Sequence, residues 1–501
     1  MAEYLTTIGL EVHAQLLTAS KMFCGCPAET HGAAAAPPNT ATCPICLGMP
    51  GTLPAVNARA IELGMRTALA LHGTISPFSK FDRKNYHYPD LMKGYQISQY
   101  DLPLGTGGWL EIDTPQGPKR IGITRVHLEE DTARLLHRAD AGGAYSLIDV
   151  NRAGVPLMEI VGEPDIATPE EASLYLVKLR QILQYIEAST GNMEEGSFRC
   201  DANVSVRPVG QAAYGTKVEV KNMNSFKAVR RALEYEVQRQ TAILEAGGTV
   251  AQETRGWSDA RGVTLGQRSK EFAHDYRYFP EPDLPPLTFT EEQVAAVAAA
   301  LPELPTARRD RLMADYGLPR DDADLLTETR PVGDYFERAL AAAQAGGTAA
   351  PAKALANLVI HDVLKQVPDS VALATLPLTP ERLVALQALV DAGTITITQA
   401  RALVPEIVRT GQAPDQLVAE RGLAQIRGGP ELDRIVAEVI AANPKMVGDY
   451  LGGKAAALQG LIGPLMRATR NKANAPEAQD VLRRQLDALA RERAGRTAPD
   501  G

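Results

Sequence analysis

The stretch that decides the fold of the first half of the chain is Leu10-Glu11-Val12-His13-Ala14-Gln15-Leu16. Side chains of a β-strand point alternately to its two faces, so the apolar residues share one face. Glu11, His13 and Gln15 share the other. The alternation predicts a strand with one buried face and one face that carries polar and ionisable groups.

The same alternation returns in other parts of the first half of the chain. The further stretches are Gly122–Asp131, Leu147–Asn151, Phe198–Arg207 and Lys217–Lys221. Asp, Glu and Asn are depleted in strands, so a sheet with one face this rich in them suggests that this face is a functional surface. The alternative is a set of solvated strand faces with surface ion pairs, which antiparallel sheets often have. Repetition across five strands of one domain favours a site.

Length and composition limit the classes of protein that fit. The chain has 501 residues, of which 45% are apolar and 22% charged, which is ordinary for a soluble globular protein of two to four domains. No apolar run of membrane-spanning length and no secretory signal are present, and five cysteines suit a reducing compartment. We therefore expect a cytoplasmic protein with no membrane contact. A net charge of −8 argues against broad adhesion to nucleic acid, although a local basic patch stays possible.

The sequence pattern changes from strand-like to helix-like near Pro285-Pro286. Before it, strand-like stretches dominate, with helices expected from Thr168-Pro169 to about Glu187 and from about Ser225 to Ala246. After it, the sequence reads as short helices rich in Ala and Leu and punctuated by prolines. We predict an α+β protein with an antiparallel-sheet-rich domain at 1–290, an all-α domain at 291–405 and a small helical tail domain at 406–501.

Four of the five cysteines form two close pairs, Cys24-Gly25-Cys26 and Cys43-Pro44-Ile45-Cys46. Two such pairs can supply the four thiolates of a tetrahedral structural zinc site. Four buried thiols without a metal are the alternative, and the close spacing beside Gly and Pro favours zinc. Cys200 lies on the apolar face of its strand, where it is expected to fill the core.

Acidic residues of the polar faces suit a hard divalent ion. Glu11, His13, Glu129 and Glu130 are the candidate ligands, because Mg²⁺ takes a few carboxylates together with waters and substrate phosphates. Asp149 and Glu159 are expected to lie nearby.

The stretch Phe81–Asp90, followed by Lys93-Gly94-Tyr95-Gln96, is dense in Lys, Arg, Asn and Tyr. Such residues donate hydrogen bonds to a phosphate, and aromatic rings among cations can stack on bases. A surface loop with buried tyrosines explains it equally well. The tail has a modest basic concentration that could meet RNA phosphates but is more often a solvated helix face. Its members are Arg467, Arg470, Lys472, Arg483, Arg484, Arg491, Arg493 and Arg496.

Seven stretches together resemble the B subunit of the bacterial aspartyl/glutamyl-tRNA amidotransferase, the GatB family. They are Ile8–His13, Phe81–Asp90, His127–Asp131, Asp149–Glu159, Glu195–Asn203, Glu219–Ser225 and Asp275–Asp283, and they occur in the order that the family has. The resemblance implies that 1–290 is a cradle-like catalytic domain with a kinase-like site and that 406–501 is a YqeY-like tail that contacts tRNA.

The resemblance also implies the activity and its participants. ATP and Mg²⁺ would phosphorylate the side-chain carboxylate of misacylated Glu-tRNA(Gln) or Asp-tRNA(Asn), and ammonia would then displace phosphate to give the amide. The glutaminase or A subunit of the complex would release the ammonia, and the small C subunit would brace the pair. Carried over by motif, Glu11, His13, Glu129 and Glu130 are magnesium ligands. Nucleotide or substrate contacts fall on Lys84, Asn85, Tyr86, Arg152, Asp201 and Asn203, with Lys84 also in a catalytic role.

Two other functions fit part of the sequence. A non-catalytic, zinc-stabilised RNA-binding protein would explain the cysteines and the basic residues, but it leaves the acidic faces without a role. A metal-dependent hydrolase would use the acidic face to activate water without ATP or a partner. Phosphorylation of Glu-tRNA that depends on ATP separates the first hypothesis from both.

Overall fold

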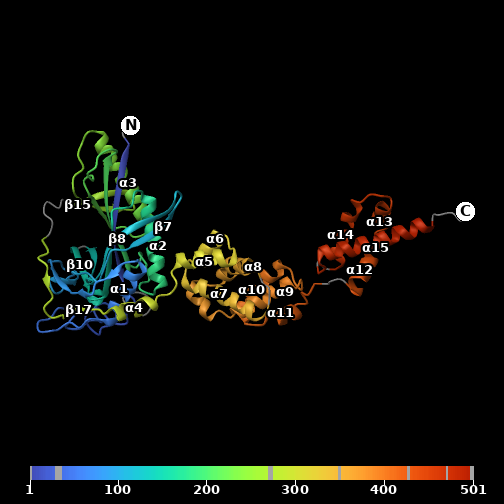
Figure 1. Cartoon of the computed structure of the whole chain (residues 1–501), viewed down its shortest axis with the longest axis horizontal. Helices are drawn as coiled ribbons and strands as arrows, with labels where there is room; N and C mark the ends of the chain where they lie inside the picture. Colours follow the sequence, from blue (N-terminus) through green and yellow to red (C-terminus); the bar gives the residue numbers. More distant parts are fainter. Residues whose placement is uncertain are drawn as a thin grey trace. The chain divides into compact units, whose positions relative to one another are not determined.

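The computed structural model describes residues 3–28, 36–140, 142–268, 275–347, 351–425, 429–469 and 472–496. The chain divides into two compact units, Met1–Ala307 and Arg308–Gly501. Figure 1 shows a strand-rich first unit, while the described residues of the second unit are helical. The predicted α+β class is thereby confirmed.

A thirteen-stranded sheet is the framework of the first unit. Its continuous order is β15-β14-β13-β12-β1-β11-β8-β5-β4-β16. Strands β6 and β7 also pair with β8, and β2 pairs with β6. Neighbouring strands are antiparallel except for β13 and β14. The strands of the continuous order are β15 (Val263–Arg268), β14 (Thr254–Ser258), β13 (Val218–Lys221), β12 (Phe198–Pro208), β1 (Tyr4–Gln15), β11 (Pro156–Gly162), β8 (Gly117–Glu130), β5 (Tyr95–Ser98), β4 (Asp82–Asn85) and β16 (Phe279–Pro280). The other strands of this sheet are β2 (Thr74–Ile75), β6 (Gly105–Thr106) and β7 (Trp109–Thr114). Two separate two-stranded sheets consist of β9 (Arg134–Asp140) with β10 (Gly143–Asp149) and of β3 (Phe78–Ser79) with β17 (Leu287–Thr288).

Helices cover the apolar face of this sheet. Leu10, Val12 and Ala14 of β1 are fully buried, as the period-two alternation predicts. They share one hydrophobic core with residues of α1 (Ala58–Ala70), α2 (Pro169–Tyr185) and α3 (Phe226–Glu245). Figure 1 shows these helices gathered around the long strands β1 and β8. The opposite, polar face is thus left for a site.

The two helices expected in this unit are present, and their first turns explain where they begin. Thr168 and Ser225 accept hydrogen bonds from backbone N–H groups of the first turns of α2 and α3. Glu171 does not complete the capping box, because its carboxylate accepts from the N–H of Ala167 and from Lys119. Thr290 does form a full capping box, at the start of α4 (Glu291–Ala299).

The second unit holds two separate hydrophobic cores. The first core collects helices between Pro305 and Glu420, and its last members are Leu417 and Val418 of α11. The second core begins at Leu432. Val294 and Val297 of α4 pack instead against the core of the first unit. The division into domains at 290 and 405 stays a prediction.

The helices of the second unit range from single turns to α15, which has 22 residues. Those of its first core are α5 (Pro305–Tyr316), α6 (Arg320–Leu326), α7 (Arg330–Ala345), α8 (Ala352–Leu358), η2 (Val359–Val363), η3 (Leu364–Gln366), η4 (Ser370–Thr375), α9 (Pro380–Asp391), α10 (Ile397–Thr410) and α11 (Pro414–Glu420). Those of its second core are α12 (Pro430–Ala442), α13 (Pro444–Leu451), α14 (Ala457–Ala468) and α15 (Ala475–Arg496).

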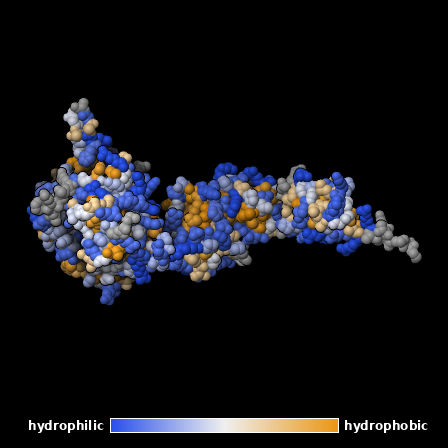
Figure 2. All heavy atoms as spheres, turned by 90° about the horizontal axis from the view of Figure 1, so that it is seen from above, coloured by the Kyte–Doolittle hydropathy of each residue, from blue (hydrophilic) through white to orange (hydrophobic). Residues whose placement is uncertain are grey.

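The surface is mixed in character. Figure 2 shows hydrophilic residues over most of the face it presents, with apolar residues gathered in places along the helical part. Exposed apolar side chains of the first helical core include Leu325, Val371 and Ile397. Within the described residues, none of the helices combines the length and the apolar character needed to cross a bilayer.

Candidate functional site

The polar face of the sheet aligns ionisable side chains across four adjacent strands. In the register, His13 of β1 lies opposite Arg199 of β12 on one side and Glu159 of β11 on the other. Glu159 in turn lies opposite His127 of β8. Directly opposed residues point to the same face, so these four side chains form a row, and Glu129 stands two residues from His127 on that face.

Three members of this face come close enough to hold one ion. His13, Glu129 and Glu159 each offer a ligand atom, and these atoms lie within 4.8 Å of one another. His13 Nε2 is 3.5 Å from Glu129 Oε1 and 3.4 Å from Glu159 Oε2. Neighbouring ligands of a small octahedral cation are about 3.0 Å apart, so the three could close on Mg²⁺ with small shifts. We call His13, Glu129 and Glu159 the trio.

Electrostatics at the trio favour a charged, hydrogen-bonded state. Burial disfavours the ionised form of Glu159, but the charges and hydrogen bonds of His127 and His13 hold the pKa of its carboxyl well below the usual range. Burial alone would lower the pKa of His13, yet Glu159 and Glu129 leave it raised. His127 Nε2 lies 3.1 Å from Glu159 Oε2, and Arg125 Nε lies 3.4 Å from His127 Nδ1. His127 therefore orients Glu159, as outer partners of metal ligands do.

The structure separates the other two predicted magnesium ligands from the trio. Glu130 follows Glu129 in the strand and so points to the opposite face. Its carboxylate accepts a hydrogen bond from the N–H of Ile97 and pairs with Lys93. Glu11 shares the face of His13, but its carboxylate accepts from Asn203 Nδ2 at 2.8 Å. Two of the four predicted ligands thus come together, and Glu159 completes the set.

A buried carboxylate, Asp131, ties the end of β8 to three other segments. It accepts hydrogen bonds from Gln15 Nε2 at 2.7 Å and from Arg199 Nη2 at 3.0 Å, and Arg152 Nε lies 3.4 Å away. Arg152 also donates to the carbonyls of Thr132 and Ala133. Burial would raise the pKa of Asp131, but the charges of Arg199 and Arg152 keep it lowered. Arg152, a predicted substrate contact, is therefore bound within this hydrogen-bond network. Arg199, held by the same carboxylate, lies opposite His13 in the sheet.

Removing the carboxylate of this network should destabilise the first unit. Asp131→Ala leaves Arg152 and Arg199 without their shared anion, and breaking a buried ion pair costs about 3–5 kcal/mol. The low end applies, because the Arg199 side chain is 37% exposed. We expect calorimetry to place the transition of this unit about 5 °C lower. Glu245→Gln, which removes an exposed carboxylate, is the control; equal midpoints for both variants would contradict the role of Asp131.

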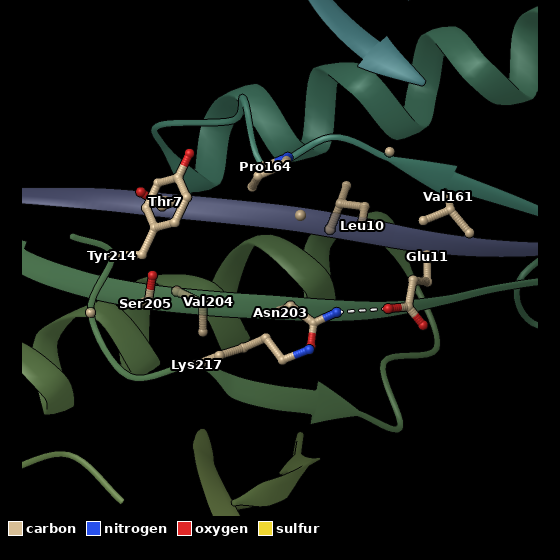
Figure 3. Close-up of a pocket in the computed structure, with 13 residues that line it drawn as sticks. Thr7, Leu10, Glu11, Val161, Pro164, Asn203, Val204, Ser205, Tyr214 and Lys217 are labelled. Atoms are coloured by element: carbon tan, nitrogen blue, oxygen red, sulfur yellow. Dashed lines mark hydrogen bonds between the residues drawn. The ribbon is translucent and has the colours of Figure 1, made fainter. Parts of the chain in front are cut away.

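A cavity of about 280 Å³ opens on the same face, further along β1. Thr7, Gly9 and Glu11 line it from β1, with Asn203 of β12 and Lys217 opposite. Figure 3 shows Thr7, Ser205 and Tyr214 at one end, Glu11 at the other, and Lys217 extending towards Asn203. Of the two predicted contacts on β12, Asn203 lines the cavity, and Asp201 is paired with Lys221.

The remaining predicted contacts lie beyond β8. Asn85 Nδ2 donates hydrogen bonds to the backbone carbonyls of Tyr276 and Arg277, so this side chain stabilises the neighbouring backbone. Tyr86 Oη donates to Gln96 Oε1 at 3.3 Å. Lys84 Nζ lies 5.0 Å from the ring centre of Tyr276. The structure therefore groups Lys84 and Tyr86 with aromatic rings, apart from the cavity.

The four paired cysteines converge. The sulfur atoms of Cys24, Cys26, Cys43 and Cys46 lie within 4.8 Å of one another. Cys43 Sγ and Cys46 Sγ are 3.9 Å apart, close to the ~3.8 Å that a tetrahedral ion with 2.3 Å zinc–sulfur bonds requires. The donor set and its geometry fit a structural zinc ion.

The surroundings of this cluster favour thiolate. The pKa of Cys46 is lowered to about 4, mainly because the Cys24 thiol donates a hydrogen bond to its sulfur. The N–H of Cys43 and the charge of Lys21 lower this pKa further, whereas burial raises it. The same hydrogen bond and burial raise the pKa of Cys24. Cys200 is buried in the core, as its face of the strand predicts.

Sequence reasoning missed Arg199, His127 and Lys217 as members of the site. Arg199 and His127 stand in polar-face stretches, but their closeness to His13 and Glu159 follows from strand order, which alternation does not give. Lys217 reaches the cavity from the segment just before β13. His274, which directly precedes the stretch Asp275–Asp283, lies outside the described residues.

Comparison with known proteins gives matches over nearly the whole chain. Residues 6–295 match the family described as GatB/GatE catalytic domain, and residues 334–486 match the family described as GatB domain. The chain is 53% identical to a protein of Roseiflexus sp. (strain RS-1) named as the B subunit of aspartyl/glutamyl-tRNA(Asn/Gln) amidotransferase, over 98% of this chain and 99% of that one. Proteins of the same name from Roseiflexus castenholzii and Thermomicrobium roseum are each 52% identical, over 97% of this chain and 99% of theirs.

Proposed function

Because the chain belongs to the GatB family of aspartyl/glutamyl-tRNA amidotransferase B subunits, we propose that it activates the side-chain carboxylate of a misacylated tRNA with ATP. Members of this family are parts of a complex that acts as a glutamine-dependent carbon–nitrogen ligase. The substrates in this proposal are Glu-tRNA(Gln), Asp-tRNA(Asn) or both.

The reaction divides into two displacements. A carboxylate is a poor acylating agent, so an oxygen of the side-chain carboxylate first attacks the γ-phosphorus of ATP, and ADP leaves. Ammonia then attacks the carbonyl carbon of the acyl phosphate, the carbon–oxygen bond to phosphate breaks, and the amide and inorganic phosphate are formed. The ammonium proton is released to solvent or base.

The observation that supports this function best is the trio beside the cavity. His13, Glu129 and Glu159 would hold Mg²⁺, which would offset the negative charge gathered during phosphoryl transfer. An imidazole is not a preferred magnesium ligand, so Mn²⁺ should replace the ion readily. The cavity would take the nucleotide, with its base near Tyr214 and its phosphates near Lys217.

The further participants follow from the family. The glutaminase or A subunit would supply ammonia, the small C subunit would brace the pair, and the complex would work in the cytoplasm. The predicted tail domain, 406–501, which holds helices α12–α15, would contact the tRNA. Zinc on the four cysteines would have a structural role.

The direct test is phosphoryl transfer without an ammonia source. The purified complex is incubated with γ-labelled ATP, Mg²⁺ and Glu-tRNA(Gln), and the acyl phosphate is trapped with hydroxylamine. Hydroxylamine also cleaves the aminoacyl ester, so the product that is scored is the hydroxamate on the side-chain carboxyl. We expect this side-chain hydroxamate to require ATP and aminoacylated tRNA. Lys217→Ala should raise the KM for ATP about tenfold, since one charged contact to phosphate is lost.

Deacylated tRNA serves as the control substrate. Side-chain hydroxamate formed without ATP, or ATP hydrolysis that deacylated tRNA stimulates equally well, would contradict carboxylate activation. Metal-dependent hydrolysis of the aminoacyl ester without ATP would favour the hydrolase alternative.

A further inference from the structure

Four tyrosines from three separate segments meet beyond β8. Tyr86 follows β4, Tyr100 follows β5, and Tyr276 and Tyr278 precede β16. The rings of Tyr100 and Tyr278 are stacked at 4.1 Å with an interplanar angle of 5°. Tyr276 meets Tyr278 edge-on at 6.0 Å and Tyr86 at 5.8 Å. We call these four side chains the tyrosine cluster.

The tyrosine cluster and the cavity lie on opposite sides of the trio. The cavity is lined by β12, β1 and β11, and the trio stands on β1, β11 and β8. The tyrosines flank β5, β4 and β16, which follow β8 in the sheet. Glu129 and Glu159, after burial, contribute to the raised pKa of Tyr278, so the cluster is within electrostatic reach of the trio. A second substrate could therefore reach the trio from this side.

The cluster has the chemistry of a nucleotide site. Tyr100 is 56% exposed although it is stacked on Tyr278, so its ring offers surface on which a base can extend the stack. Lys84 Nζ lies 5.0 Å from the ring of Tyr276 and 5.9 Å from that of Tyr86. Among the described residues, no carboxylate lies within ion-pair distance of Lys84, which leaves its charge for an anion. A ring platform beside an ammonium suits a base and its phosphate.

We propose that the tyrosine cluster binds the 3′-terminal adenosine of the aminoacyl-tRNA, with the adenine stacked on Tyr100 and the adjoining phosphate against Lys84. The amino acid esterified to that adenosine would then extend towards the trio, while ATP enters from the cavity on the other side. This inference rests on the proposed function, because it places the second substrate of the same reaction.

The test compares tRNA with and without its last nucleotide. Binding of deacylated tRNA(Gln) to the purified complex is measured for the wild type, Tyr100→Ala and Tyr100→Phe. One base stack is worth about tenfold in affinity, so Tyr100→Ala should weaken binding about tenfold and Tyr100→Phe by less than twofold. With tRNA that lacks the terminal adenosine, all three proteins should bind equally. Tyr145→Ala, which removes a 48% exposed ring from the separate β9–β10 hairpin, is the matched control and should change neither affinity.

Kinetics separate the two sources of an adenine ring. Tyr100→Ala should raise the KM for Glu-tRNA(Gln) and leave the KM for ATP and the glutaminase rate of the complex unchanged. A raised KM for ATP alone would assign the stack to ATP and overturn the proposal, as would an equal loss of affinity with tRNA that lacks the adenosine. The binding measurement needs no phosphoryl transfer, so a wild type that forms no acyl phosphate would count against the proposed function and not against this site.

Discussion

Replacement of Glu159 by glutamine should lower ATP-dependent hydroxamate formation from Glu-tRNA(Gln) about 10³-fold, while the glutaminase reaction of the assembled complex stays near its normal rate. The amide keeps the size of the side chain but removes the negative charge of Glu159. The trio thereby loses one anionic ligand, and His127 and His13 lose the carboxylate beside them. A metal ion contributes several kcal/mol of charge stabilisation to such a step, and about 4 kcal/mol corresponds to three orders of magnitude.

Metal affinity is the readout that separates a ligand from other essential residues. Mn²⁺ binding, followed by electron paramagnetic resonance, should weaken strongly in Glu159→Gln. Glu130→Gln should leave it nearly unchanged, because that carboxylate is held by the N–H of Ile97 and by Lys93. Equal Mn²⁺ affinity in the wild type and in Glu159→Gln would remove the trio as the ion site, whatever the activity of the variant.

Part of this site can be predicted from alternation alone. The period of two places Glu11 and His13 on one face and Asp201 and Asn203 on one face of their own strand, and the register joins them, with Glu11 opposite Asp201. The same rule separates Glu129 from Glu130, since consecutive residues of a strand face opposite ways. Alternation is a local property, so it predicts faces reliably wherever one side of a strand is buried.

Strand order is the part that the sequence alone does not provide. Glu159 meets His13 because β11 lies between β1 and β8, a pairing of segments nearly 150 residues apart in the chain. The position of Glu159 in the sequence does not indicate that His13, rather than another residue, will be its neighbour. Asn85 illustrates the reverse case: its residue type suits a ligand contact, yet its amide holds the backbone of Tyr276 and Arg277. Side-chain chemistry therefore suggests candidates, and topology selects among them.

Loss of one zinc ligand is expected to have the largest effect on stability. Cys46→Ser should abolish the bound zinc, measured as metal content by mass spectrometry, and should destabilise the first unit by about 4 kcal/mol. The effect should extend beyond the cysteines, because Pro37 and Ala41, which lie between the two pairs, are hydrogen-bonded to other residues of this unit. Lys21 Nζ donates to the carbonyl of Ala41, and Asn151 accepts from the N–H of Ala41 and donates to the carbonyl of Pro37.

The fifth cysteine supplies the matched control for the zinc prediction. Cys200→Ala removes a buried thiol from the core and none from the cluster, so it should keep one zinc per chain and cost about 1–2 kcal/mol. A chelator should lower the melting temperature of this variant and of the wild type but not that of Cys46→Ser, which has no metal left to lose. If the wild type contains no zinc and melts at the same temperature with and without the chelator, the four thiols do not form a structural metal site. Among the described residues, the part around Ala41 would then be held by the hydrogen bonds of Lys21, Asn39 and Asn151.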